Sequence, residues 1–251
     1  MGMIIAVVNQ KGGVGKTTSA VNLTAALTEA GKRVLLCDFD PQANATSGMG
    51  LDKRKIKKSS YDVVVEQLPA KEAIVATQYG DVLPATADLA GAAVELISLP
   101  EPNRRLGSAL DEVRADYDLI LIDCPPSLEL LTINALAAAD SILVPVQCEY
   151  YALEGLADLM NTLRLVKKRI NPQLEIFGVA LTMFDGRTNF STQVAQEVRR
   201  HFPGKVFASV IPRNVRLAEA PSHGLPVTVY DRTSRGSAAY KAMAQEIINR
   251  L

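Results

Sequence analysis

The chain has 251 residues, 48% of them hydrophobic, which is enough material for one α/β domain with a substantial core. Its apolar runs end after about 5–8 residues, well short of the roughly 20 that a membrane-spanning helix needs, and the first run lacks the basic leader of a signal peptide. The formal net charge is +0, so the chain as a whole has no electrostatic attraction to nucleic acid. These properties predict a cytoplasmic protein with a single domain over residues 1–251.

Short apolar runs rich in β-branched residues alternate with segments of helical spacing along the chain. Successive residues in these runs are apolar and do not alternate with polar ones. This pattern is typical of parallel strands that are covered on both faces. The predicted strands are Ile4–Val8, Val34–Cys37, Leu119–Ile122, Ile142–Val146, Ile176–Phe184 and Val206–Ile211. The predicted helices are Thr18–Glu29, Leu130–Ala139, Ala152–Lys168, Ser191–His201 and Ser237–Leu251. This order predicts an α/β fold with a doubly wound, mostly parallel twisted sheet flanked by helices.

The first motif follows the first predicted strand and reads Asn-Gln-Lys-Gly-Gly-Val-Gly-Lys-Thr-Thr over residues 9–18. A strand before it and a helix after it are the context that a phosphate-binding loop requires. Its glycines let backbone N–H groups curl around phosphate oxygens, Lys16 can reach the β- and γ-phosphates, and the Thr17 hydroxyl can hold Mg²⁺. The usual spacing needs glycine where Gln10 stands, and an additional lysine, Lys11, precedes the double glycine. The motif therefore predicts a site for ATP and Mg²⁺ with an unusual loop.

Acidic residues close two of the next predicted strands. Asp38 and Asp40 follow the run that starts at Val34, and Asp123 follows the run that starts at Leu119. Because ligand sites in open α/β sheets gather at the carboxyl ends of the strands, we expect these carboxylates beside the phosphate-binding loop. There they could hold the metal and orient the attacking water. An aspartate in this position can also be a turn residue or a helix N-cap, so the pattern leaves the individual roles open.

Cysteine and basic residues add two smaller expectations. Cys37, Cys124 and Cys148 are far apart and lie in or beside apolar runs, so we expect small buried residues rather than disulfides or metal ligands. Basic residues outnumber acidic ones between Arg199 and Lys241, which predicts a positively charged region despite the neutral total.

In its motifs the chain resembles the ParA/Soj DNA-partitioning ATPases of the deviant Walker A group, whose loop is marked by Lys-Gly-Gly-x-Gly-Lys-Thr-Thr. The resemblance spans nearly the whole chain, and it is carried by Asn9–Thr18, Asp38–Gly48, Asp123–Ser127, Val144–Gly155, Leu181–Asn189 and Ile211–Gly224. The loop directly follows the first strand. The N-terminal helix-turn-helix extension of larger plasmid relatives is therefore expected to be absent.

The resemblance implies that Lys11, Lys16 and Asp40 are the catalytic residues. Lys11 would reach into a second copy of the chain and touch the phosphates bound there, so that two copies sandwich ATP. Asp40 would orient or activate the attacking water, while Thr17 and Asp123 would hold Mg²⁺. The nucleotide would be bound by Lys11, Gly12, Gly13, Val14, Gly15, Lys16, Thr17 and Thr18, with Pro212 and Asn214 on the adenine side.

The same resemblance implies an ATP-dependent homodimer that binds double-stranded DNA non-specifically, and a ParB-type partner that stimulates hydrolysis and releases the DNA. Such binding uses arginine and lysine side chains aimed at phosphates. Arg187 and Arg216 stand where similar proteins carry DNA-contacting arginines. Further candidates from the basic region are Arg213, Arg232, Arg235 and Lys241. The expected protein is a cytoplasmic, nucleoid-associated ATPase of chromosome or plasmid partitioning, without membrane attachment.

Three other interpretations remain open at this stage. A membrane-positioning ATPase similar to MinD would need a basic and apolar C-terminal tail, which residues 242–251 lack. An iron–sulfur reductase or cluster carrier would need paired or symmetry-related cysteines. A nucleotide-dependent scaffold that does not hydrolyse ATP is disfavoured by Lys11 and Asp40.

Overall fold

The computed structural model describes residues 1–149 and 152–251, and the side chains of residues 152–155 are outside this description. Its six strands form one sheet in the order β3-β2-β4-β1-β5-β6, and every ladder is parallel. The strands are β1 (Met3–Val7), β2 (Val34–Asp38), β3 (Asp81–Leu83), β4 (Leu119–Asp123), β5 (Ser141–Gln147) and β6 (Glu175–Thr182). The doubly wound, parallel sheet expected from the sequence is confirmed.

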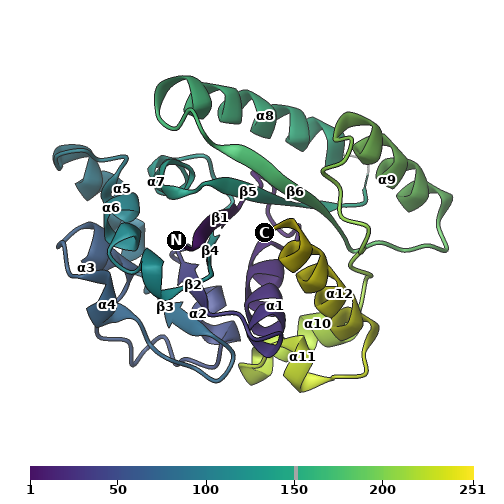
Figure 1. Cartoon of the computed structure of the whole chain (residues 1–251), viewed down its shortest axis with the longest axis horizontal. Coiled ribbons are helices and arrows are strands. Elements are labelled where there is room, and N and C mark those ends of the chain that lie inside the picture. Colours follow the sequence, from purple (N-terminus) through teal and green to yellow (C-terminus); the bar gives the residue numbers. More distant parts are fainter. Residues whose placement is uncertain (150–151) are drawn as a thin grey trace.

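Helices lie on both faces of this sheet (Figure 1). The α-helices are α1 (Lys16–Glu29), α2 (Asn44–Gly48), α3 (Ser60–Val64), α4 (Ala70–Ala73), α5 (Leu89–Glu95), α6 (Arg105–Asp111), α7 (Leu130–Ala138), α8 (Ala152–Arg169), α9 (Asn189–His201), α10 (Val215–Glu219), α11 (Val227–Tyr230) and α12 (Arg235–Arg250). The 3₁₀ turns are η1 (Leu96–Ser98), η2 (Arg114–Asp116) and η3 (Ala220–His223). The five long helices predicted from the sequence are all present.

The core consists of two apolar layers, one on each face of the sheet. Along β1, Ile4 and Ala6 belong to the layer that includes α6, α7 and α8, while Ile5 and Val7 belong to the layer that includes α1 and α12. All four side chains are buried, as expected for a central strand covered on both faces. The carboxyl ends of β1 and β4 are neighbours, so the loop after β1 and the aspartate at the end of β4 come together.

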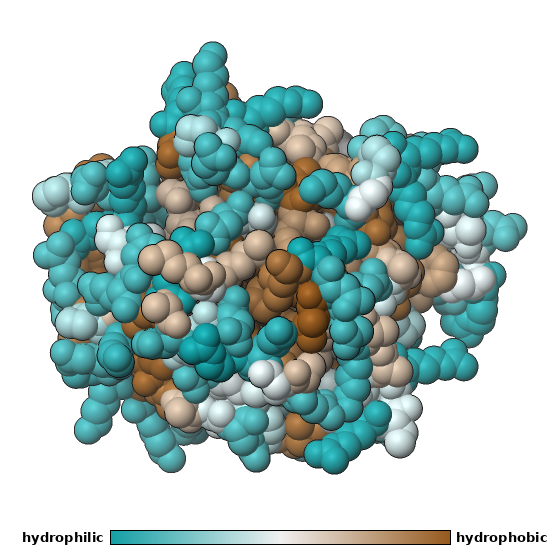
Figure 2. Space-filling view, in the orientation of Figure 1, coloured by the Kyte–Doolittle hydropathy of each residue, from teal (hydrophilic) through white to brown (hydrophobic). Residues whose placement is uncertain are grey.

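Figure 2 shows the face that carries both chain termini, in the orientation of Figure 1. Hydrophilic residues cover most of this face, and apolar residues gather near its centre. The exposed side chains of Met1 and Leu251 line a shallow hollow there, together with Met3 and Tyr117. This hollow lies at the amino ends of the strands, away from the predicted site.

The predicted strand Val206–Ile211 is wrong. Phe207 and Ile211 donate backbone hydrogen bonds to β6, but the residues between them do not continue the ladder. The amides of Ala208 and Ser209 donate instead to the carboxylate of Glu246 on α12, at 2.9 and 2.7 Å. Because a side chain captures these two donors, the segment follows the edge of the sheet without forming a regular strand.

No helix or strand was predicted from the sequence between residues 44 and 116. Its helices span between four and seven residues, and β3 has three. Elements this short contain at most two helical turns, so their hydrophobic periodicity is too weak to be recognised.

Candidate active site

The predicted phosphate-binding loop connects β1 to α1 and is held by hydrogen bonds to β5 and β6. The amide of Asn9 donates to the carbonyl of Pro145 in β5 at 2.8 Å, and its side-chain oxygen accepts from the backbone of Lys11. The hydroxyl of Thr182 in β6 donates to the carbonyl of Val14 at 2.8 Å. The loop is therefore fixed by β5, which is next to β1, and by β6, which is next to β5.

Two glycines of the loop adopt backbone conformations that favour glycine. Gly13 has a φ of 75° and Gly15 a φ of 91°, both in the left-handed region. Gly15 directly precedes α1, so the turn delivers the chain to the helix N-terminus, where the unpaired N–H groups favour an anion. The backbone of residues 9–18 can therefore accommodate an anion at the N-terminus of α1.

The two lysines of the loop occupy different environments. Lys16 is buried, and its ammonium donates to the carbonyl of Lys11 at 3.0 Å. Burial lowers the pKa of Lys16, while the nearby Asp123 opposes this effect. The ammonium of Lys11 lies at the half-exposed rim and contacts the carboxylate of Glu149. The ammonium of Lys16 can therefore contact a ligand inside the loop, whereas the ammonium of Lys11 lies next to solvent.

Asp123 is the most unusual group of the site. It is fully buried, and among the described residues neither of its carboxylate oxygens has a hydrogen-bond partner of normal geometry. Burial and the neighbouring Asp38 raise the pKa of Asp123 well above its usual range, although Thr17 lies close enough to lower it in part. A buried carboxylate without partners is costly unless a cation or donor compensates it. Two free carboxylate oxygens beside a threonine hydroxyl match the oxygen ligands that Mg²⁺ prefers.

Asp38 has a different environment, although it is the neighbour of Asp123 across the sheet. It accepts hydrogen bonds from the backbone and hydroxyl of Thr46, both at 2.7 Å, and from the backbone of Asp40 at 3.3 Å. The Thr46 hydroxyl also accepts from the backbone of Ala85 at 2.9 Å. Burial raises the pKa of Asp38 to about 6, although these hydrogen bonds lower it in part. Asp38 therefore anchors the loop that carries Asp40, and Thr46 is a site residue that the sequence did not reveal.

Asp40 is largely buried in the turn after β2. One oxygen accepts from the backbone of Gln42 at 2.9 Å, a bond that stays within the turn. The coulombic effect of Asp40 on the pKa values of Lys16 and Asp123 places the three groups in one electrostatic cluster. The structure thus brings together the loop lysine and the aspartates that the sequence predicted as neighbours.

A cavity of about 280 Å³ extends from the loop toward α10 and α12. Pro212 and Asn214, which the sequence analysis assigns to the adenine side, line it together with Gly15 and Thr18 of the loop. Its other walls are largely apolar, which suits the flat face of a base. The sequence missed Met183, Leu217 and Tyr240, which also line this cavity. Met183 and Leu217 lie within the segments Leu181–Asn189 and Ile211–Gly224 that carry the family resemblance, but neither was assigned to the site, and Tyr240 lies outside every motif.

The two predicted DNA-binding arginines are exposed, and each is paired with carboxylates of its own chain. Arg187, after β6, makes a two-pronged contact with Asp185 at 2.9 and 2.7 Å. Arg216 in α10 pairs with Glu219 at 2.8 Å and with Asp231 at 3.2 Å. Of the further candidates, Lys241 pairs with Glu29 at 2.7 Å, so its charge is also partly compensated.

Several remaining expectations concern residues outside this site. Cys37, Cys124 and Cys148 are buried free thiols, as predicted. In the part of the chain that the structure describes, no helix is both long and apolar enough to cross a bilayer, and no group of three or more His, Cys, Asp or Glu side chains is arranged to hold a metal. In the segment Val144–Gly155, which carries part of the family resemblance, Tyr150 and Tyr151 lie outside the described residues.

Comparison with known proteins gives a family model and close relatives. The model, described as an AAA domain, matches residues 2–176. The chain is 56% identical to the sporulation initiation inhibitor protein Soj of Bacillus subtilis, over 98% of both chains. It is 51% identical to the chromosome partitioning protein ParA of Caulobacter vibrioides, over 98% of this chain and 94% of the relative. It is also 50% identical to the chromosome-partitioning ATPase Soj of Thermus thermophilus, over 98% of this chain and 96% of the relative.

Solved structures are similar over the whole chain. A structure described as cobyrinic acid a,c-diamide synthase from Mycobacterium smegmatis, with bound ADP and magnesium, has a TM-score of 0.87 at 37% identity and covers 99% of this chain and 95% of its own. The cell division ATPase MinD of Pyrococcus furiosus has a TM-score of 0.82 at 30% identity, with complete coverage of both chains.

Proposed function

The chain belongs to the ParA/Soj family of chromosome-partitioning ATPases, and we propose that MgATP joins two copies of it into a dimer that binds DNA non-specifically. Hydrolysis, stimulated by a ParB-type partner, then separates the copies and releases the DNA. This cycle places the protein in the cytoplasm, on the nucleoid. The observation that carries the proposal is the buried carboxylate of Asp123, which lacks a hydrogen-bond partner among the described residues and lies beside the phosphate-binding loop.

The residues around the loop fit a nucleoside triphosphate with a divalent cation. We assign the phosphates to the backbone of residues 11–18 and to the ammonium of Lys16. The Thr17 hydroxyl and the Asp123 carboxylate would hold Mg²⁺, which when bound neutralises phosphate charge during the transfer. Pro212 and Asn214, which line the adjoining cavity, would border the adenine. A neighbouring structure bound to ADP and magnesium supports this choice of ligands.

We assign to Asp40 the role of orienting the attacking water. One of its carboxylate oxygens is engaged only within its own turn, and the group sits in the same electrostatic cluster as Lys16 and Asp123. In this position Asp40 can orient a water toward the γ-phosphorus. The water oxygen then bonds to phosphorus as the bond to the bridging oxygen of ADP breaks.

Lys11 and Gly12 support the dimer. The Lys11 ammonium lies at the rim of the site rather than inside it, where a second copy could receive it. A side chain at Gly12 would meet no atom of its own chain within 4 Å. The fold of one chain therefore does not require glycine at this position, whereas a close approach of two loops would. A lysine from each copy over the other copy's phosphates would make dimerisation depend on the γ-phosphate.

DNA binding by nucleotide state tests this function most directly. The purified protein is mixed with DNA in the presence of ATP, ADP or no nucleotide, at several salt concentrations. We expect DNA binding in the presence of ATP and none with ADP or without nucleotide. The logarithm of the affinity should fall linearly with the logarithm of the salt concentration, because arginine and lysine contacts to phosphate release counterions. Equal binding with ADP, or binding that is indifferent to salt, would contradict the proposal.

The alternative of a membrane-positioning ATPase is less well supported. The apolar residues of α12, among them Tyr240, Met243 and Ile247, are buried in the core layer shared with α1. They are therefore not available to a lipid surface. Sedimentation with liposomes in the presence of ATP distinguishes the two functions, and we expect the protein to stay in the supernatant.

A further inference from the structure

The walls of the cavity beside the phosphate-binding loop continue into the two segments that carry the proposed DNA-binding arginines. Met183 lines the cavity and shortly precedes Arg187, while Asn214 and Leu217 line it on either side of Arg216 in the sequence. The side chains of Arg187 and Arg216 are 89% and 52% exposed, so both can reach a ligand in solution. The proposed adenine site and the proposed DNA-binding residues therefore share their backbone.

Asn214 belongs to the cavity and also begins the helix of Arg216. Its backbone is extended, and its side-chain oxygen accepts a hydrogen bond from the backbone N–H of Arg216 at 2.8 Å, which makes it the N-cap of α10. The first N–H groups of a helix have no partner within the helix. Because α10 has only five residues, this cap satisfies a large share of its backbone donors. The position of Arg216 therefore depends on Asn214.

Leu217 holds α10 against α12. This side chain is buried, and a Cβ atom at Gly236 of α12 would lie 2.8 Å from its Cγ atom. The two helices are thus in tight contact at this point, and α10 has no room to move closer to α12. The cavity, which Leu217 also lines, is open space beside α10. A ligand in the cavity would fill that space and restrict α10 further.

The segment that precedes Arg187 is hydrogen-bonded to the turn at residues 211–214, which we call the adenine-side turn. The backbone of Phe184 donates to the carbonyl of Ile211 and accepts from the backbone of Arg213, both at 3.1 Å. The next residue, Asp185, holds the guanidinium of Arg187 in the two-pronged contact described above. The adenine-side turn is therefore connected to the segments of both arginines.

Met183 completes this connection from the other wall of the cavity. It has a φ of 49°, a left-handed conformation that is strained for a residue with a side chain and that recurs at functional sites. A base in the cavity of about 280 Å³ can contact Met183 on one segment and Leu217 on the other. Such a base would hold the two segments in a fixed relation to each other.

We propose that Asn214 is a positioning residue for DNA binding, and that adenine in the cavity holds Arg187 and Arg216 in their DNA-binding positions through the adenine-side turn. This inference rests on the proposed function. The γ-phosphate assembles the dimer, whereas the base sets how tightly the assembled dimer binds DNA.

A matched pair of variants separates the cap from the contact with the base. Asn214→Ala and Asn214→Ser both lose the side-chain amide, so both should bind ATP more weakly. Serine keeps an acceptor for the backbone N–H of Arg216, whereas alanine does not. Each variant is made alone and together with Arg216→Ala. DNA affinity is measured across a salt series at the MgATP concentration at which light scattering shows complete dimerisation of that variant.

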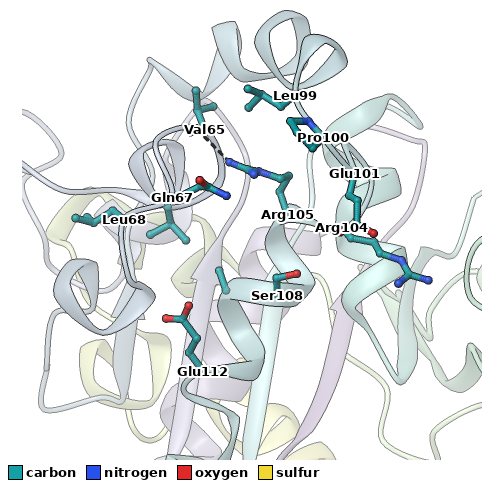
Figure 3. Close-up of a pocket in the computed structure, with 12 residues that line it drawn as sticks. Val65, Gln67, Leu68, Leu99, Pro100, Glu101, Arg104, Arg105, Ser108 and Glu112 are labelled. Carbon is teal, nitrogen blue, oxygen red and sulfur yellow. Dashed lines mark hydrogen bonds between the residues drawn. The ribbon is translucent and has the colours of Figure 1, made fainter.

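The chain offers a control cap at a distant place. Ser59 accepts from the backbone of Tyr61 at 3.2 Å and is the N-cap of α3, which also has five residues. α3 borders a different cavity, of about 340 Å³, where Arg105 of α6 donates to the carbonyl of Val65 just after α3 (Figure 3). Figure 1 places α3 and α10 on opposite sides of α1. Ser59→Ala should lower the melting temperature but leave DNA affinity at the wild-type level.

We expect Asn214→Ala to bind DNA at least about fivefold more weakly than Asn214→Ser, a change of the size that a helix cap can produce. Its slope of log affinity against log salt should be smaller by about 1, as if the phosphate contact of Arg216 were lost. Adding Arg216→Ala to Asn214→Ala should then cause little further loss, because the two residues act through one contact. Equal DNA affinity in the alanine and serine variants, or additive losses with Arg216→Ala, would overturn the role of Asn214.

Tripolyphosphate tests the role of the base in the wild-type protein, because it supplies the phosphates without ribose or adenine. We expect magnesium tripolyphosphate to support the dimer, and this dimer to bind DNA at least about fivefold more weakly than the MgATP dimer, a loss of the same order as that of the cap. Equal DNA affinity of the two dimers would overturn the role of the base, and so would a failure of tripolyphosphate to support a dimer. Both results would leave the proposed function intact, whereas a wild-type protein that does not bind DNA with MgATP would overturn that function.

Discussion

Thr46 donates two hydrogen bonds of 2.7 Å to the carboxylate of Asp38, one from its backbone and one from its hydroxyl. The same hydroxyl accepts from the backbone of Ala85 after β3. A single threonine thus links the ends of β2 and β3 to the loop that carries Asp40. Because all three partners are buried, the contacts are shielded from water and hold the loop in one position.

Replacing Thr46 tests this link. Thr46→Val removes the hydroxyl, so a buried carboxylate loses a donor and a buried N–H loses its acceptor. We expect the free energy of unfolding, measured with urea, to fall by about 1–3 kcal/mol. The ATPase kcat should fall between about tenfold and a hundredfold through misplacement of Asp40. Thr46→Ser keeps the hydroxyl and should retain nearly wild-type kcat. Wild-type stability and kcat in Thr46→Val would show that the hydroxyl does not hold the loop.

Asp40 should be needed for hydrolysis but not for assembly. Its visible hydrogen bond lies within its own turn, so Asp40→Ala should cost little stability. We expect ATP binding and ATP-dependent dimerisation to persist while hydrolysis falls about 10²- to 10⁴-fold, the usual contribution of a positioned acid–base group. Size-exclusion chromatography and phosphate release measure the two effects. Normal turnover would remove Asp40 from this role, and a strictly monomeric Asp40→Ala protein with saturating MgATP would contradict the dimer.

Asp123 should make the protein less stable without its cation. Asp123→Asn removes the buried negative charge, so the melting temperature of the nucleotide-free protein should stay the same or rise. The variant should lose the stabilisation by MgATP, which for wild type at 100 times the Kd amounts to about 2.7 kcal/mol. Wild type with ATP and EDTA should behave as the variant does with MgATP. If Asp123→Asn retained the full effect of MgATP, the metal site would have to be sought elsewhere.

Lys11 should act between chains rather than within one. Its contact with Glu149 is half-exposed, and pairs of this kind contribute about 0–1 kcal/mol, so Lys11→Ala should leave the melting temperature nearly unchanged. We expect the variant to bind ATP and remain monomeric. Glu149→Gln is the matched control, because it breaks the same ion pair but keeps the lysine, and it should still dimerise. A dimer in Lys11→Ala, detected by light scattering with MgATP, would argue against the sandwich.

The features that the sequence predicted well are those encoded locally. The loop at residues 9–18 and the aspartates at the ends of β2 and β4 follow from strand, turn and helix signals along short segments. The role of Thr46 could not be predicted, because its partners Asp38 and Ala85 meet it only through the packing of β2, β3 and α2. The same reason explains the failed strand near Ala208, whose amide is taken by Glu246 of the distant helix α12. Tertiary contacts overrode local preference at these places.

The carboxylate of Asp185 should compete with DNA for Arg187. The guanidinium of Arg187 lowers the pKa of Asp185 to about 2, chiefly through their side-chain hydrogen bonds. The carboxylate is therefore ionised throughout the range of about pH 5–8, and the competition should not depend on pH there. Asp185→Asn keeps an acceptor for the backbone of Arg187 but removes the charge. We expect it to tighten ATP-dependent DNA binding several-fold, by the same factor at both ends of this range.

Arg187→Ala should have the opposite effect, weakening DNA binding and reducing the slope of log affinity against log salt by about 1, as expected for the loss of one phosphate contact. The chain offers a close control in Arg54, which makes the same kind of two-pronged contact with Asp52, at 3.0 and 3.3 Å, in an exposed loop. Arg54→Ala removes an equal charge from an equivalent local geometry. If it lowered the salt slope as much as Arg187→Ala, the effect would reflect total charge, and the assignment of Arg187 to the DNA-binding face would fail.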